Sequence, residues 1–269
     1  MISYAETCRR CLKTNIAEKP LYARTVTFFF STRIVWLLSV TNVTPNTISY
    51  LSLFCGLASA YFILEPAVAP NLMWSAVLLE IYYILDCVDG QLSRLRQNQT
   101  KTGAFLDTII TYLVQSALYF ALGIGLFYDT GKFYFVLLGA VAAFSTMWIS
   151  LIWHFRASIF VYFIRRSGGV KLRPHSAVSA DAKKNFPAGL AFSWLQKSLT
   201  FPLTMNLLTL VGITACLSQT FGGSVSALKL AESYLVYTSC ASIIVAFTLT
   251  LRWISKRKID SDYAELFEA

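Results

Sequence analysis

Charged residues are scarce in this chain. Asp, Glu, Lys and Arg make up 14% of its 269 residues and hydrophobic residues 56%, whereas a soluble domain carries about 25% charged residues. This shortage excludes an ordinary soluble globular domain. The mean hydropathy of +0.56 agrees, so the sequence predicts an integral membrane protein.

Acidic residues are the scarcer of the two charge types. The chain has 14 Asp and Glu against 23 Lys and Arg, which gives a net charge of +9. In a membrane protein this excess indicates cytoplasmic loops beside anionic lipid headgroups, and we expect no nucleic-acid partner. A basic pocket for an anionic substrate is a second interpretation, compatible with the first.

Several other signals are weak or missing. Six cysteines are scattered and imply no disulfide framework. Cys8 and Cys11 form a C-x-x-C pair without a second pair or a nearby histidine, which leaves a zinc or redox site as a minor alternative. We find no internal repeat, and the first residues are too polar for a signal peptide.

Long apolar runs, by contrast, are abundant. A spanning helix needs about 20 mostly apolar residues. Six stretches qualify, at roughly 46–65, 71–92, 103–127, 133–158, 199–219 and 231–253. A shorter run at 25–40, interrupted by Arg33, predicts a helix that lies on the membrane surface. The expected fold is therefore all-α, with six transmembrane helices plus an N-terminal interfacial helix.

The distribution of Lys and Arg predicts the orientation. With the N-terminus inside, every Lys and Arg except Lys132 and Lys229 lies on the cytoplasmic side, as the positive-inside rule requires. We expect a cytoplasmic segment at 1–44, a transmembrane catalytic domain at 45–255 and a cytoplasmic tail at 256–269. The run from 133 stays apolar to Ile164, so the fourth helix should extend into the cytoplasm.

Three carboxylates lie where the second and third spans meet. Asp86 and Asp89 are i, i+3 neighbours on one helix, and Asp107 lies at a similar depth on the next. Buried carboxylates repel one another and are costly in a membrane, so a divalent cation with oxygen ligands is the simplest compensation. Nearby Arg94 and Arg96 could pair with these aspartates or bind phosphate.

This combination favours phosphoryl transfer. Phosphoryl transfer at the cytoplasmic face would use a divalent metal and arginines. It would also use glycines, because they let a ligand come close to the backbone. A transporter fits less well, because its site normally lies near the midplane between broken helices.

The same stretch resembles the signature of the CDP-alcohol phosphotransferase (CDP-alcohol phosphatidyltransferase) family. That signature is D-x-x-D-G-x-x-A-R, eight or nine residues, then G-x-x-x-D-x-x-x-D. Here it is Asp86-x-x-Asp89-Gly90-x-x-Ser93-Arg94, eight residues, then Gly103-x-x-x-Asp107-x-x-x-Thr111. Pro45-Asn46-Thr47-Ile48-Ser49 is similar to the family's P-N-x-I-T opening of the first span.

The resemblance implies an activity and its residues. A CDP-alcohol donor such as CDP-diacylglycerol would bind, an acceptor alcohol would attack the phosphorus that carries the donor alcohol, and CMP would leave. One or two Mg²⁺ or Mn²⁺ ions would be held by Asp86, Asp89 and Asp107. The pocket would be lined by Asn46, Ser49, Gly90, Ser93, Arg94 and Gly103. The resemblance also implies a homodimer among membrane lipids.

Two residues depart from the signature. Ser93 replaces an alanine and adds one hydroxyl. Thr111 replaces the final aspartate, which in the family is a ligand of the second metal and the proposed general base. A threonine hydroxyl cannot deprotonate an alcohol at neutral pH, and general base catalysis is worth about 10²–10⁴-fold.

Three interpretations of Thr111 remain. The enzyme is active because its acceptor is already anionic or because another residue is the base, with His154 and Glu80 as the nearby candidates. Alternatively, the chain binds nucleotide or lipid without chemistry. As a third interpretation, the threonine was introduced to stop turnover. We favour the first.

The basic segment at 165–197 is either a solvated cytoplasmic loop or a lid over an anionic substrate. Arg156, Arg165 and Arg166 extend the fourth helix below the membrane, where a phosphate on the acceptor could meet them.

This hypothesis predicts that Arg156→Ala raises KM for the acceptor more than KM for the CDP donor, measured by steady-state kinetics. Equal effects on the two KM values would contradict it.

Overall fold

The computed structural model describes residues 3–12, 23–65, 69–166, 199, 201–220 and 226–255, and within them the chain is helical, without a strand. The elements are α1 (Tyr4–Cys11), η2 (Ala23–Thr27), α2 (Phe28–Leu38), α3 (Pro45–Phe62), α4 (Ala69–Leu95), α5 (Lys101–Thr130), α6 (Tyr134–Arg166), α9 (Phe201–Thr220) and α10 (Ala227–Ser255). The all-α prediction is confirmed.

Local sequence sets the ends of α3 and α5. Thr44 precedes α3, and its Oγ1 accepts a hydrogen bond from the backbone N–H of Thr47 at 3.2 Å. Pro45 takes the first helical position, as predicted. Proline has no backbone N–H, and at this position an N–H would have no partner within the helix. Thr100 caps α5 in the same way, accepting from the N–H of Gly103 at 3.0 Å. Both caps lie at the candidate site described below.

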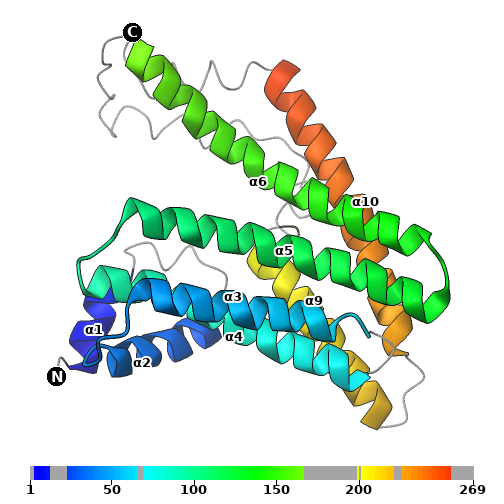
Figure 1. The fold of residues 1–269 in the computed structure, drawn as a ribbon, viewed down its shortest axis with the longest axis horizontal. Coiled ribbons are helices and arrows are strands. Elements are labelled where there is room, and N and C mark those ends of the chain that lie inside the picture. Colours follow the sequence, from blue (N-terminus) through cyan, green and yellow to red (C-terminus); the bar gives the residue numbers. More distant parts are fainter. Residues whose placement is uncertain are drawn as a thin grey trace.

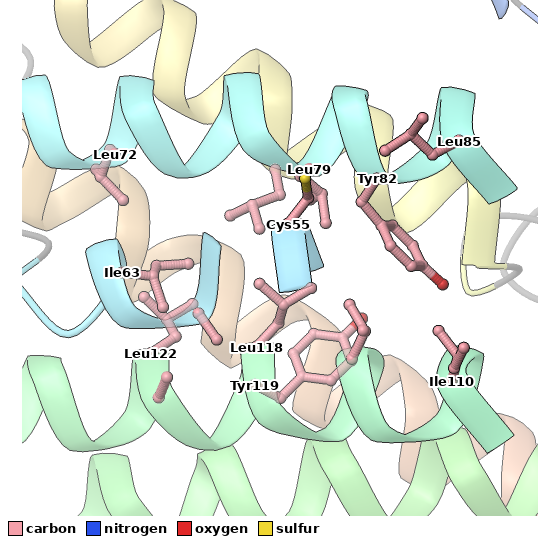
Figure 2. Packing of buried hydrophobic residues seen from close by; sticks show 14 of the residues in the cluster. Cys55, Ile63, Leu72, Leu79, Tyr82, Leu85, Ile110, Leu118, Tyr119 and Leu122 are labelled. Atoms are coloured by element: carbon pink, nitrogen blue, oxygen red, sulfur yellow. The ribbon is translucent and has the colours of Figure 1, made fainter. Parts of the chain in front are cut away.

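The helices α3, α4 and α5 run side by side, with α6 and α10 beyond α5 and α9 against α4 (Figure 1). The buried core lies between α3, α4 and α5 and includes Tyr82, Leu79 and Leu118 (Figure 2). Gly56 permits the close approach of these helices, because a Cβ there would lie 2.5 Å from Cγ2 of Val114. The helix α3 therefore joins α4 and α5, because it packs against both.

Each of the six predicted spans coincides with a helix. Four of these helices are long and apolar enough to cross a membrane: Pro70–Leu95, Lys101–Thr130, Tyr134–Arg166 and Ala227–Ser255. The helix α3 is not among the four; it carries Asn46 and Thr47 and several serines. Its role as a span, and that of α9, stays a prediction. The 33 residues of α6 rise about 50 Å, more than the roughly 30 Å of the hydrocarbon core.

The predicted helix at 25–40 is present as η2 and α2. Its buried side combines polar Ser31 and Thr32, at 0% and 3% exposure, with Val35 at 0%, whereas Phe29, Phe30 and Leu37 are exposed. A helix that turns its apolar side outward fits contact with lipid. Its place at the membrane surface stays a prediction.

Candidate active site

A polar cavity of about 300 Å³ lies where α4 ends and α5 begins. It is lined by Thr44, Pro45, Asn46, Ser49, Asp89, Gly90, Ser93, Arg94, Asn98, Gln99, Thr100, Gly103, Ala104 and Asp107. These residues come from the start of α3, the end of α4, the connection between α4 and α5, and the start of α5. The cavity therefore brings together eight of the ten predicted site residues, and Asp86 and Thr111 lie one turn deeper on their helices.

The two glycines leave room that side chains would fill. A Cβ on Gly103 would lie 3.1 Å from Oγ1 of Thr100 and 3.6 Å from Oδ1 of Asn46. A Cβ on Gly90 would lie 3.4 Å from Nη1 of Arg94. Because these glycines have no side chains, the space between Thr100, Asn46 and Arg94 stays open.

The three aspartates converge as the hairpin geometry predicts. Asp89 is buried, and its Oδ2 accepts a hydrogen bond from the Ser49 hydroxyl at 2.5 Å. Asp86 interacts electrostatically with Asp89 and Asp107 and shares a hydrogen bond with the Asp107 carboxyl group. The exposed Asp107 faces the cavity.

Within the part of the chain that the structure describes, no three His, Cys, Asp or Glu side chains are arranged to hold a metal ion. Asp89 points to Ser49, while Asp86 and Asp107 point to each other. The donor set nevertheless fits a hard divalent ion in its chemistry, because it offers only oxygen atoms and carries negative charge that a cation would offset. The assignment of these aspartates as ligands stays a prediction.

Thr111 is turned toward its own helix. Its hydroxyl donates to the backbone carbonyl of Asp107 at 3.0 Å, and the Tyr82 side chain lies near it. Tyr82 is fully buried on α4 and points toward α5 near Ile110 (Figure 2). Sequence reasoning missed Tyr82, although its position four residues before Asp86 places both on one helix face.

The two alternative bases lie outside the cavity lining. Glu80 accepts a hydrogen bond from the Thr209 hydroxyl at 2.9 Å, which joins α4 to α9. His154 is exposed on α6, and its ring meets that of Tyr112 edge-on with centroids 5.9 Å apart. The structure therefore gives neither residue a contact with the cavity.

Arg94 and Arg96 have different partners. Arg94 lines the cavity, and its Nε donates to the backbone carbonyl of Cys11 at 2.7 Å. The structure does not pair Arg96 with the aspartates, which was one of the two predicted alternatives; phosphate binding by Arg96 stays a prediction. Its guanidinium donates to the carbonyls of Val43, Leu38 and Thr41 at 2.5, 3.0 and 2.7 Å. Arg96 therefore holds the turn between α2 and α3, because carbonyls at a helix end lack partners within the helix.

The Cys8–Cys11 pair offers little metal or redox chemistry. Both cysteines are free, and burial raises the pKa of the Cys11 thiol to about 11. A thiol that stays protonated at neutral pH is a poor ligand and nucleophile.

Some predicted features lie outside the described residues: most of the segment at 165–197 and the tail at 256–269. The side chain of Arg156 is also not described. Arg165 and Arg166 are exposed at the end of α6.

The fold and the cavity define a class: a helical protein with apolar, membrane-compatible helices and a carboxylate-bearing polar site at one end of the bundle. A sequence model of the CDP-alcohol phosphatidyltransferase family matches residues 42–254. The chain therefore belongs to the CDP-alcohol phosphatidyltransferase family. This is a transferase family, and membership implies transfer of a phosphoalcohol group from a CDP-alcohol to an alcohol acceptor.

Among curated proteins, the chain is similar to an uncharacterized protein of Aquifex aeolicus (strain VF5). The two are 36% identical over 84 residues, which cover 31% of this chain and 40% of the relative. Since the match spans less than half of that relative, it supports no conclusion about activity.

Proposed function

We propose that this protein transfers a phosphoalcohol group, such as a phosphatidyl group, from a CDP-alcohol to an acceptor alcohol and releases CMP, with Mg²⁺ or Mn²⁺ as cofactor. One observation carries the proposal: a single cavity within the family-matched residues gathers Asn46, Arg94, Gly103 and the carboxyl groups of Asp89 and Asp107. Such a site suits a nucleoside diphosphate held by a cation, an arginine and backbone amides.

The donor diphosphate would lie between Arg94 and the start of α5. A helix N-terminus carries partial positive charge and unpaired N–H groups, which favour phosphate. Thr100 and Gly103 are in the cavity lining at this terminus, and the guanidinium of Arg94 faces it from α4. Gly90, Ser93, Asn46 and Ser49 complete the donor pocket.

Asp86, Asp89 and Asp107 would hold the divalent ions. When bound, the ions would offset the charge of the diphosphate and polarise the reacting phosphoryl group. The acceptor oxygen forms a bond to the phosphorus that carries the donor alcohol, and the bond from that phosphorus to the CMP oxygen breaks. The acceptor proton passes to the exposed carboxyl group of Asp107 when the acceptor is not already ionised.

A second function, binding without turnover, is favoured by Thr111. Its hydroxyl is bonded within α5 and cannot act as the missing carboxylate. The cavity would then bind nucleotide or lipid.

We also propose that both termini and the cavity are cytoplasmic and that the protein is a homodimer. The concentration of Lys and Arg on one side supports the orientation. The four apolar helices and the family membership indicate a membrane protein.

Removal of divalent metal tests the proposal. The purified protein is given CDP-diacylglycerol and a panel of polar alcohols and alcohol phosphates, and CMP is measured. We expect CMP release with Mg²⁺ or Mn²⁺, loss of release in EDTA, and recovery when either ion is returned. Unchanged release in EDTA would contradict the metal requirement. CDP binding without CMP release from any acceptor would favour the second function.

A further inference from the structure

The N-terminal helix α1 reaches the cavity through Arg94. The Nε of Arg94 donates to the carbonyl of Cys11, 83 positions earlier in the chain, at 2.7 Å. The family match begins at residue 42, so α1 lies outside the matched region. This contact therefore joins an element beyond the family core to a residue of the candidate donor pocket.

The helix α1 is held firmly against its neighbours. Cys11 and Thr7 are 0% exposed. The hydroxyl of Tyr4 forms a hydrogen bond with that of Thr32 at 2.9 Å, and the Tyr4 ring meets Trp36 edge-on at 6.3 Å between centroids. These contacts attach α1 to α2, and α1 also packs on α4.

Within α1, the chain provides its own stabilising interactions. Ser3 caps its start by accepting a hydrogen bond from the N–H of Glu6 at 3.2 Å. Glu6 also forms ion pairs with Arg9 and Arg10 one turn later. A short helix with a cap and internal pairs presents its last carbonyls in a fixed direction.

The end of α1 is suited to an arginine. The last carbonyls of a helix lack intrahelical partners, and this end carries partial negative charge. The N–H of Leu12 donates a hydrogen bond to the Cys8 carbonyl at 3.2 Å. The Cys11 carbonyl accepts its hydrogen bond from Arg94. Because a guanidinium is planar and rigid, a bond at Nε fixes the direction of Nη1 and Nη2.

Those two terminal nitrogens lie at the cavity. A Cβ built on Gly90 would lie 3.4 Å from Nη1 and 3.9 Å from Nη2, and Arg94 and Gly90 both line the cavity. We propose that α1 is a positioning element, and that the Cys11 carbonyl holds Arg94 so that Nη1 and Nη2 meet the diphosphate of the CDP-alcohol. This inference rests on the proposed function.

The test measures CDP affinity of the full-length protein by calorimetry with Mg²⁺ present. Cys11→Trp places a large side chain at a position with no exposure and displaces the end of α1. We expect about tenfold weaker CDP binding, as for loss of one charged hydrogen bond to phosphate. Ala5→Trp is the matched control, because Ala5 is exposed on the same helix, and this variant should keep its affinity.

A double-mutant cycle separates positioning from general damage. Arg94→Ala should weaken CDP binding about tenfold, and adding Cys11→Trp to Arg94→Ala should weaken it no further. Deletion of residues 3–12 provides a second perturbation with the same expectation, and the elution profile in detergent checks that each variant is folded.

Two results would overturn the inference alone: deletion of α1 that leaves CDP affinity unchanged, or a Cys11→Trp effect of equal size with and without Arg94. Failure of the unmodified protein to bind CDP would overturn the proposed function, and this inference with it.

Discussion

Asp107→Asn is expected to lower the rate of CMP release by at least about 10³-fold. The carboxyl group is exposed to the cavity and interacts with Asp86 and Asp89, so it would serve both as a metal ligand and as the proton acceptor. Asparagine keeps the size of the side chain but loses the charge, which removes metal stabilisation and base catalysis together. Initial rates of CMP release at saturating CDP-diacylglycerol measure this effect.

Asp129→Asn is the control for that variant. Asp129 lies near the other end of α5, so the same chemical change there should leave the rate within about twofold. An Asp107→Asn protein that is folded and retains full activity would show that this aspartate has no part in the reaction.

Thr111→Asp is expected to raise the rate of CMP release by about 10²-fold for a neutral acceptor alcohol. A carboxylate one turn beyond Asp107 adds a second proton acceptor, at the position where the family signature has its last aspartate. General base catalysis by such a carboxylate raises a reaction rate by about 10²–10⁴-fold. The lower end of that range is expected because Tyr82 lies against position 111 and restricts the orientation of a new side chain. The measurement compares initial rates for neutral alcohols and for alcohol phosphates.

Thr108→Asp, which adds the same charge on the same helix three residues earlier, should give no gain. If Thr111→Asp leaves the rate unchanged while the unmodified protein is active, position 111 does not limit turnover. If only the Thr111→Asp variant releases CMP, the natural chain is a binding protein rather than an enzyme.

The main features of the site follow from spacing along the chain. Asp86 and Asp89 share a face of α4, and the short turn to α5 returns Asp107 to the same depth. The caps at Thr44 and Thr100 add two helix starts beside them. Helix periodicity and turn length are local properties, so the sequence predicts this convergence.

Other features depend on contacts between distant segments, which local patterns do not encode. Arg96 lies two residues from Arg94 and has the same chemistry, yet it binds the carbonyls of Leu38, Thr41 and Val43. The docking of α1 on Arg94 spans 83 positions. Tyr82 on α4 comes near Thr111 on α5 because α3 packs against both helices. Each of these contacts is set by tertiary packing.

The serines of α3 show why hydropathy along the sequence cannot by itself identify every membrane span. Ser49, Ser52 and Ser59 lower the apolar character of this helix, but all three are buried against the bundle, and Ser59 bonds to the carbonyl of Ser75 at 2.8 Å. Hydropathy alone does not distinguish polar residues that face other helices from those that face lipid.

The fate of the donor phosphorus tests the central claim most directly. The purified protein is incubated with Mg²⁺, an acceptor alcohol and CDP-diacylglycerol labelled at the phosphorus that carries the diacylglycerol. The account predicts labelled phosphodiester product and unlabelled CMP in equal amounts. Label in free phosphatidic acid would show hydrolysis instead of transfer, and an unchanged donor with every acceptor would contradict the proposed enzyme.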